Sequence, residues 1–307
     1  MNKILSKKTT KQKIMEFFFP LYPLKVFSNI SSITTFAVLI ALRMILQLTS
    51  FYIPIFSFSI SVSWTPLIII GWLYGPVYGF VAGFVTDSLG ILMSGSVWFW
   101  LYAIQEPMVG IIAGLFGYLC RLRLSKDVVN KKSKIIDFVI FDFFLIFFSG
   151  ISIYFLIEFT KSSVSFEGKS KLEEIFFVYS KWIILGVMSF FLVFSNVLEI
   201  IFFKKFVRNF VFCSWLISLV CILSVLMSFL LGPISANEFY KYMYGNDSPL
   251  FIKYGVIFYL IPRVFKESIK APIQVLILII VIPIASNYIE KIKMAKFLKW
   301  NIDNKKT

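Results

Sequence analysis

The chain has 307 residues, of which 59% are hydrophobic and only 15% are charged. A soluble domain is close to half apolar and a quarter charged, so this composition excludes a water-soluble fold and indicates an all-α integral membrane protein. The formal net charge of +15 comes from lysines and arginines clustered between apolar runs, a pattern typical of cytoplasmic loops and not of a nucleic-acid-binding surface.

The inventory of reactive side chains also excludes several kinds of site. There is no histidine, and the three cysteines, Cys120, Cys213 and Cys221, form no C-x-x-C pair. A Cys/His metal site and a Ser-His or Cys-His catalytic pair are therefore excluded. Residues 168–170 read Gly-Lys-Ser, but Ser163 stands where a phosphate-binding loop requires glycine. We expect no metal, no cofactor and no nucleotide-hydrolysing site.

Long apolar runs predict eight membrane crossings, because runs of about 20 residues match the thickness of a bilayer. A basic segment, residues 1–30, precedes them and a basic tail, residues 288–307, follows. The predicted crossings are 31–51, 58–74, 76–93, 97–120, 135–158, 175–203, 210–232 and 254–287.

The charges of the connecting segments predict the topology. Eight crossings place the N-terminal arm, the loops 121–134 and 204–208 and the C-terminal tail, all rich in lysine and arginine, on one side. The intervening loops, 159–174 and 233–253, mix acidic and basic residues. The positive-inside rule then predicts a multi-pass protein of the plasma membrane with both termini in the cytoplasm.

The first crossing carries two features. Ala37 and Ala41 lie one helical turn apart and would form a groove for another helix, although alanine is common in such segments. Arg43 follows in the outer half of the same helix. An arginine inside a membrane rarely faces lipid, so it indicates a pocket or a buried ion pair.

The third crossing has small residues at an interval of four. Gly75, Gly79 and Gly83 share one helical face and favour close helix packing, as does Gly90 further along. Asp87 continues the same interval. A carboxylate in a membrane helix is costly and should face a partner or an aqueous cavity.

Aromatic and polar residues gather at the outer ends of the early helices, among them Trp64, Thr65 and Trp98. They indicate either an interfacial aromatic belt or a pocket that stacks on a planar ring. In the last crossing Arg263, Lys266 and Lys270 share a helical face. They would form a positive site for an anion together with Arg43, or extend to the outer headgroups.

Taken in order, these motifs resemble the S components of energy-coupling factor (ECF) transporters, and the folate-type branch most closely. The matching elements are the Ala37/Ala41 pair, the glycine and aspartate block of residues 66–90, and the ending Arg263…Lys266…Pro272. The resemblance covers residues 31–121 and, less fully, 212–287.

The resemblance implies a six-helix subunit that binds a vitamin near the outer surface and topples in the membrane to release it inside. It also implies as partners a transmembrane coupling subunit, contacted by Ala37 and Ala41, and two ATP-binding subunits. The chain is longer than such subunits. We therefore expect helices 1–4 at 31–121, an inserted hairpin at 135–203, and helices 5 and 6 at 210–287.

The leading prediction is a non-enzymatic, vitamin-binding subunit with a preference for folate or a related pterin. Arg43, Arg263 and Lys266 would hold carboxylates, Trp64 and Trp98 would stack on the ring with Thr65 nearby, and Asp87 would bind a polar ring edge or cap the structure. The alternatives are another vitamin such as riboflavin or thiamine, a stand-alone secondary transporter, and a lipid-modifying membrane enzyme.

Overall fold

The computed structural model describes residues 15, 17–20, 30–53, 58–124, 131–161, 182, 185–186, 189–197, 200–201, 207–254 and 256–303. These residues are almost entirely helical, and the predicted all-α fold class is confirmed. In this part of the chain strands occur in one short antiparallel hairpin, in which β1 (Phe51–Ile53) pairs with β2 (Phe58–Ile60).

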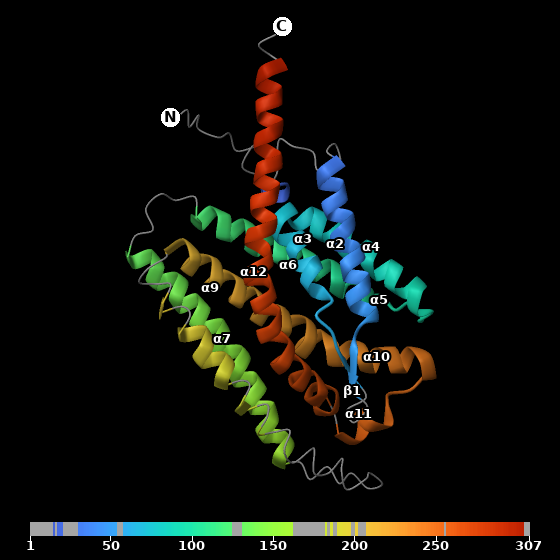
Figure 1. Ribbon diagram of the computed structural model, residues 1–307. Coiled ribbons are helices and arrows are strands. Elements are labelled where there is room, and N and C mark those ends of the chain that lie inside the picture. Colours follow the sequence, from blue (N-terminus) through green and yellow to red (C-terminus); the bar gives the residue numbers. More distant parts are fainter. Residues whose placement is uncertain are drawn as a thin grey trace.

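The helices follow one another with few interruptions, and Figure 1 shows α2 beginning and α12 ending on the same side of the molecule. Their bounds are α2 Ile30–Leu48, α3 Trp64–Tyr74, α4 Pro76–Ser94, α5 Trp100–Ala103, α6 Gln105–Leu124, α7 Lys131–Lys161, α9 Val207–Leu223, the π-helix η3 Ser224–Leu231, α10 Gly232–Tyr244, α11 Pro249–Tyr254 and α12 Ile257–Asp303.

Six helical stretches among the described residues are long and apolar enough to cross a membrane. Together they establish a multi-pass membrane protein. They are Ile30–Leu48, Pro76–Ser94, Trp100–Leu124, Ile135–Tyr154, Phe210–Tyr244 and Pro262–Ile289.

The centre of the fold is a close-packed group of α3, α4 and α6, which α9 and α12 contact from one side and α2 from another. Glycines allow the three central helices to approach closely. A Cβ atom at Gly79 would collide with the Gly110 backbone, and one at Gly71 would meet the same residue. Their interface is therefore a contact of backbone on backbone.

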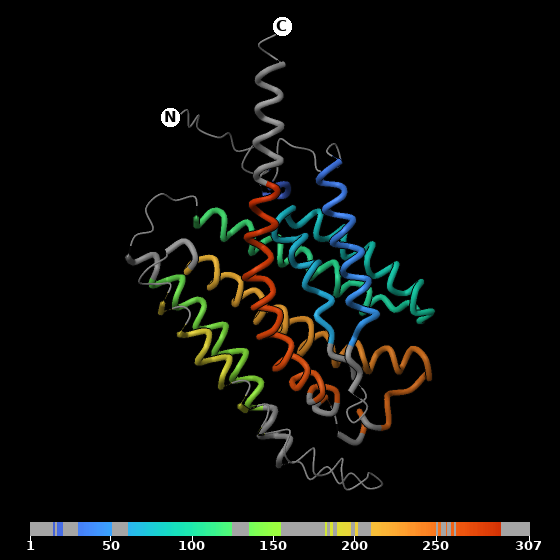
Figure 2. The backbone as a smooth tube through the Cα atoms, viewed as in Figure 1, coloured from blue at the N-terminus to red at the C-terminus, as the bar shows by residue number. Residues whose placement is uncertain are grey.

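Helix α7 lies outside this group, and Figure 2 shows it running alongside α9. Its main contacts are with α9 and α12. A second link runs through Arg123 of α6, whose Nε donates to the Asp137 carboxylate of α7 at 3.0 Å. About half of the predicted second arm of this hairpin, 175–203, lies outside the described residues.

Near the N-terminus, Phe17 packs edge-on against Tyr118 of α6, and Phe19 packs against Tyr78 of α4. At Gly75 the backbone has a φ of +98°, and an added Cβ would clash with Pro20. This part of the predicted segment 1–30 therefore packs on the core. The rest of the segment, apart from Met15 and Ile30, lies outside the described residues.

The segment predicted as a crossing at 58–74 contains a helix that is shorter and more buried than expected. Strand β2 occupies its start, and α3 has only 11 residues, which rise about 16 Å, half of a hydrocarbon core. Every residue of α3 from Thr65 to Tyr74 is buried. The run is apolar because protein surrounds it on all sides, and an all-round apolar pattern does not distinguish that setting from lipid.

The helices near the C-terminus are longer than predicted. The loop expected at 233–253 contains α10 and α11. Pro233 lies in the first turn of α10, where its missing N–H has no partner to lose. Helix α12 continues to Asp303, into the range assigned to the tail, because that range is rich in helix-favouring lysine.

Candidate functional site

A buried ion pair joins α2, α4 and α6. Arg43 of α2 is 3% exposed, and its guanidinium pairs with Glu106 of α6 and donates to Gln47 one turn further along α2. The other Glu106 oxygen accepts a hydrogen bond from Thr86 of α4 at 2.7 Å. One buried carboxylate thus holds three helices, and its hydrogen bonds offset part of the cost of burying the charges.

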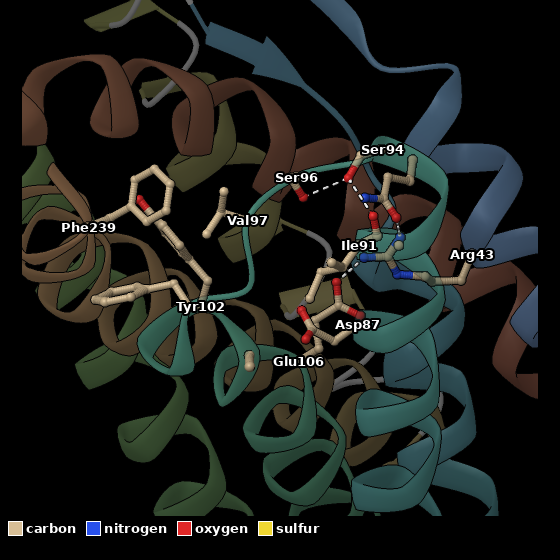
Figure 3. Close-up of a pocket in the computed structure, with 13 residues that line it drawn as sticks. Arg43, Asp87, Ile91, Ser94, Ser96, Val97, Tyr102, Glu106 and Phe239 are labelled. Carbon is tan, nitrogen blue, oxygen red and sulfur yellow. Dashed lines mark hydrogen bonds and ion pairs between the residues drawn. The ribbon is translucent and has the colours of Figure 1, made fainter. Parts of the chain in front are cut away.

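A cavity of about 310 Å³ opens beside this ion pair. Figure 3 shows Tyr102 and Phe239 on one side of it and Arg43, Asp87 and Glu106 on the other. Asp87 is half-buried, and its carboxylate is close enough to Arg43 for electrostatic interaction. No other ion pair or hydrogen bond engages Asp87 within the described residues. The cavity therefore has an aromatic wall and an acidic wall.

A second cavity, of about 430 Å³, adjoins the first. Both are lined by Arg43, Gln47, Gly90 and Ser94, so these residues form the border between them. Each cavity falls within the size range of small-molecule pockets, about 300–1,000 Å³. The second cavity adds one ammonium group and several hydroxyl groups, from Lys266 and from Ser50, Ser61 and Ser63.

The four glycines singled out in the sequence have different surroundings. Gly79 and Gly83 face the backbone of α6, whereas Gly75 faces the N-terminal residues. Gly90 lies at the border of the cavities, where an added Cβ would come within 2.9 Å of the Gln47 Oε1 atom. Glycine at this position leaves room for the Gln47 side chain beside Arg43.

The cations of α12 also have different surroundings. Lys270 is buried and pairs with Glu267 at 2.7 Å, and its Nζ lies 4.3 Å from the centre of the Trp64 ring. Ser224 of η3 donates to the second Glu267 oxygen at 2.8 Å. Lys270 is thereby held by partners inside the protein, and Lys266, one turn earlier, is the α12 cation that lines a cavity.

Arg263 lies one further turn toward the start of α12. Its guanidinium occupies the space where a Cβ at Gly232 would lie and interacts with Tyr102. Arg263 lines neither cavity, so its contact with the site passes through the Tyr102 side chain.

The predicted stacking residues do not lie in the cavities. Trp64 packs under Lys270, Thr65 is buried, and Trp98 is 58% exposed and lines neither cavity. The aromatic side chains at the first cavity are Phe99, Tyr102 and Phe239.

Sequence reasoning missed Phe239 and Glu106 for different reasons. Phe239 belongs to α10, which fell in a predicted loop. Glu106 follows an apolar, aromatic run, and a lone carboxylate at that position was a usable signal of a buried partner.

Helix α2 presents two different faces. Arg43 is buried on one, whereas Ala37 and Ala41 are exposed on the other. A step of about 100° per residue puts position 41 some 200° from position 43, which accounts for the separation. The exposed alanines, with Val38 and Leu42 beside them, form a smooth strip on the outside of the helix.

A family model for the "ECF-type riboflavin transporter, S component" matches residues 27–202. The chain belongs to this family. An S component is a transport subunit of the membrane and is not an enzyme by itself. The match runs through α7 and ends before α9, although α9 and α12 pack against α6 and α3 in the same core.

Individual relatives support the assignment. An uncharacterized protein, the MG313 homolog of Mycoplasma pneumoniae, is 32% identical over 92% of this chain and 99% of its own length. Uncharacterized protein MG313 of Mycoplasma genitalium is 30% identical with the same coverage. A UPF0397 protein of Lactobacillus gasseri is 31% identical over 35% of this chain and 57% of its own length. No solved structure matches this S component.

Proposed function

We propose that this S component captures a planar vitamin with an anionic group, folate or a related pterin, for an ATP-driven importer. The observation that carries the proposal is that Arg43 of α2 and Lys266 of α12 line one cavity, although 223 positions separate them in the chain. The Lys266 ammonium group would bind the carboxylate by charge-assisted hydrogen bonds, while Arg43, held by Glu106 and Gln47, borders the same cavity. In this proposal Arg263 acts on the ligand through Tyr102.

The cavities open, in our proposal, toward the outside of the cell. They lie where α2 and α4 end and where α6 begins, because Leu48, Ser94 and Glu106 line them. The opposite end of α6 carries Arg121 and Arg123. Basic residues favour the cytoplasmic side, so the ligand would enter from the other side, with both termini in the cytoplasm.

Energy would come from other proteins. The exposed strip of Ala37 and Ala41 on α2 fits close contact with a helix of a transmembrane coupling subunit, which would work with two ATP-binding subunits. Since α7 packs mainly on α9 and α12, at the edge of the core, we assign residues 135–203 to an inserted hairpin between helices 4 and 5.

Isolation of the protein with its native partners tests this proposal. Mass spectrometry should identify a coupling subunit, ATP-binding subunits and a bound anionic vitamin. Finding riboflavin or thiamine bound would support the proposed S-component role and show that folate is not the ligand. Uptake that is driven by a proton or sodium gradient, with no ATP-binding subunit in the complex, would contradict the proposal.

A paired variant tests the partner surface separately from the cavity. Ala37→Trp combined with Ala41→Trp should abolish co-purification of the coupling subunit, because two indoles would hold a neighbouring helix away. Folate binding by the isolated subunit should stay unchanged, since both residues lie on the outer face of α2. Replacement of the exposed Val38 by Ala in the same helix is the control, and it should leave both properties intact.

A further inference from the structure

The two adjoining cavities differ in charge. The first contains two carboxylates, Asp87 and Glu106, and one guanidinium, that of Arg43, which pairs with Glu106, so its charged groups sum to one negative charge. The second contains Lys266, which forms no ion pair within the part of the chain that the structure describes. Arg43 stands at the border and is neutralised by Glu106. The combined site is therefore polarised from end to end and is not uniformly positive.

The uncharged lining differs in the same direction. Beside Asp87 the wall is aromatic, with Phe99, Tyr102 and Phe239. Beside Lys266 the lining includes the hydroxyl groups of Ser50 and Ser63, and that of Ser61, which donates to the Leu46 carbonyl oxygen at 2.8 Å. Aromatic rings favour the flat face of a ring system, whereas an ammonium group among hydroxyls provides hydrogen-bond donors for an anion.

From this arrangement we infer that the site accepts a dipolar ligand in one direction only. A flat heteroaromatic end with N–H donors on its edge occupies the Asp87 cavity, and an anionic end occupies the Lys266 cavity. The inference rests on the proposed function and adds to it the orientation of the ligand and the basis of selectivity.

Asp87 is the residue that discriminates in this arrangement. An ionised carboxylate only accepts hydrogen bonds, so it fits two adjacent N–H groups such as those of a 2-amino-pyrimidinone ring. A ring edge that offers only carbonyl oxygens would leave Asp87 without a partner and face repulsion between oxygen atoms. An anionic group placed beside Asp87 would meet a like charge.

Fragments of folate test the two ends independently. The full chain is purified in detergent, and its affinities for folate, pterin and p-aminobenzoyl-glutamate are measured by calorimetry for the wild type, Asp87→Asn and Lys266→Gln. Asp87→Asn should lower the affinity for folate and for pterin by about tenfold or more, the value of a hydrogen bond to a charged group. It should leave the affinity for p-aminobenzoyl-glutamate unchanged. Lys266→Gln should lower the affinity for folate and for p-aminobenzoyl-glutamate to a similar extent and leave the affinity for pterin unchanged.

Two controls match these changes. Asp142→Asn alters a carboxylate of α7, and Lys241→Gln alters an exposed lysine of α10, and neither residue lines the cavities. Both should bind all three probes as the wild type does.

The outcomes separate the two levels of the proposal. The orientation is wrong and the proposed function stands if the wild type binds folate but each variant lowers the affinity for both fragments equally. The same conclusion follows if Asp87→Asn raises the affinity for folate. If the wild type binds none of the three probes, both the proposed ligand and the orientation are overturned.

Discussion

The two halves of the α4–α6 pair are held together by different kinds of contact. In one half, Gly79 and Gly110 bring the two backbones into direct contact. In the other half, Asp87 and Glu106 stand at the cavity, with Thr86 of α4 joined to Glu106 of α6 at 2.7 Å. Gly83 lies between the two halves and faces the backbone of Glu106 and Pro107.

This difference shows how the fold supports charged groups inside a membrane. The glycine half fixes the separation of the helices by steric contact, which tolerates no added atoms. The charged half then relies on that separation, because the ion pair of Arg43 and Glu106 needs defined positions to offset its desolvation. Changes in the glycine half should therefore affect the whole protein, and changes around the cavity should have smaller and more specific effects.

The largest effect is expected for Gly79→Leu. The side chain has no space against the Gly110 backbone, and neither helix can give way, so the substitution should destabilise the protein by more than about 4 kcal/mol. Thermal unfolding and size-exclusion chromatography in detergent measure the result. Gly150→Leu in α7 is the matched control, because an added Cβ there meets nothing within 4 Å. Equal behaviour of the two variants would contradict the steric interpretation.

Glu106→Ala is expected to have the next largest effect. It leaves the Arg43 guanidinium buried without its carboxylate, which should cost about 3–5 kcal/mol of unfolding free energy. Denaturation in mixed micelles measures this. The double variant Arg43→Met with Glu106→Leu should recover much of the loss, because no charge then remains buried. A double variant that is less stable than Glu106→Ala would argue against the ion pair as the cause.

The two lysines of α12 should respond in opposite ways. Lys270→Met leaves Glu267 buried with Ser224 as its remaining hydrogen-bond partner, so it should cost about 3 kcal/mol of stability without changing folate affinity. Lys266→Met should change stability by less than about 1 kcal/mol and weaken folate binding. Thermal unfolding and calorimetry on the same samples decide the matter. If Lys270→Met also weakens binding in a folded protein, both cations belong to the site.

The smallest effect concerns the aromatic side chains. Phe239→Leu removes a ring from the wall of the first cavity and should reduce the affinity for pterin by about 1 kcal/mol, or fivefold. Trp98→Leu should leave the affinity unchanged, because that indole is exposed outside both cavities. Calorimetric titration with pterin compares them. A greater loss in Trp98→Leu would restore the stacking role predicted from the sequence.

Much of the fold followed from the sequence because lipid imposes strict rules on a chain. Runs of apolar residues and the positions of lysines and arginines predicted helices close to those of α2, α4, α6, α7 and α9. The short length of α3 and its burial in protein were not foreseen, because burial in protein and in lipid selects the same residues. Helix α10, which brings Phe239 to the cavity, was missed because its composition is more polar than that of a membrane helix.

By itself the sequence determined that this is a helical membrane protein, and that Arg43, Asp87 and Lys266 are charges placed where lipid would exclude them. Only the tertiary structure decided which charges meet. Arg43 pairs with Glu106 and Lys270 with Glu267, which leaves Lys266 and Asp87 facing the cavities. The physical reason is that spacing along one helix defines a shared face, whereas the partner of a buried charge is set by the neighbouring helices packed against it.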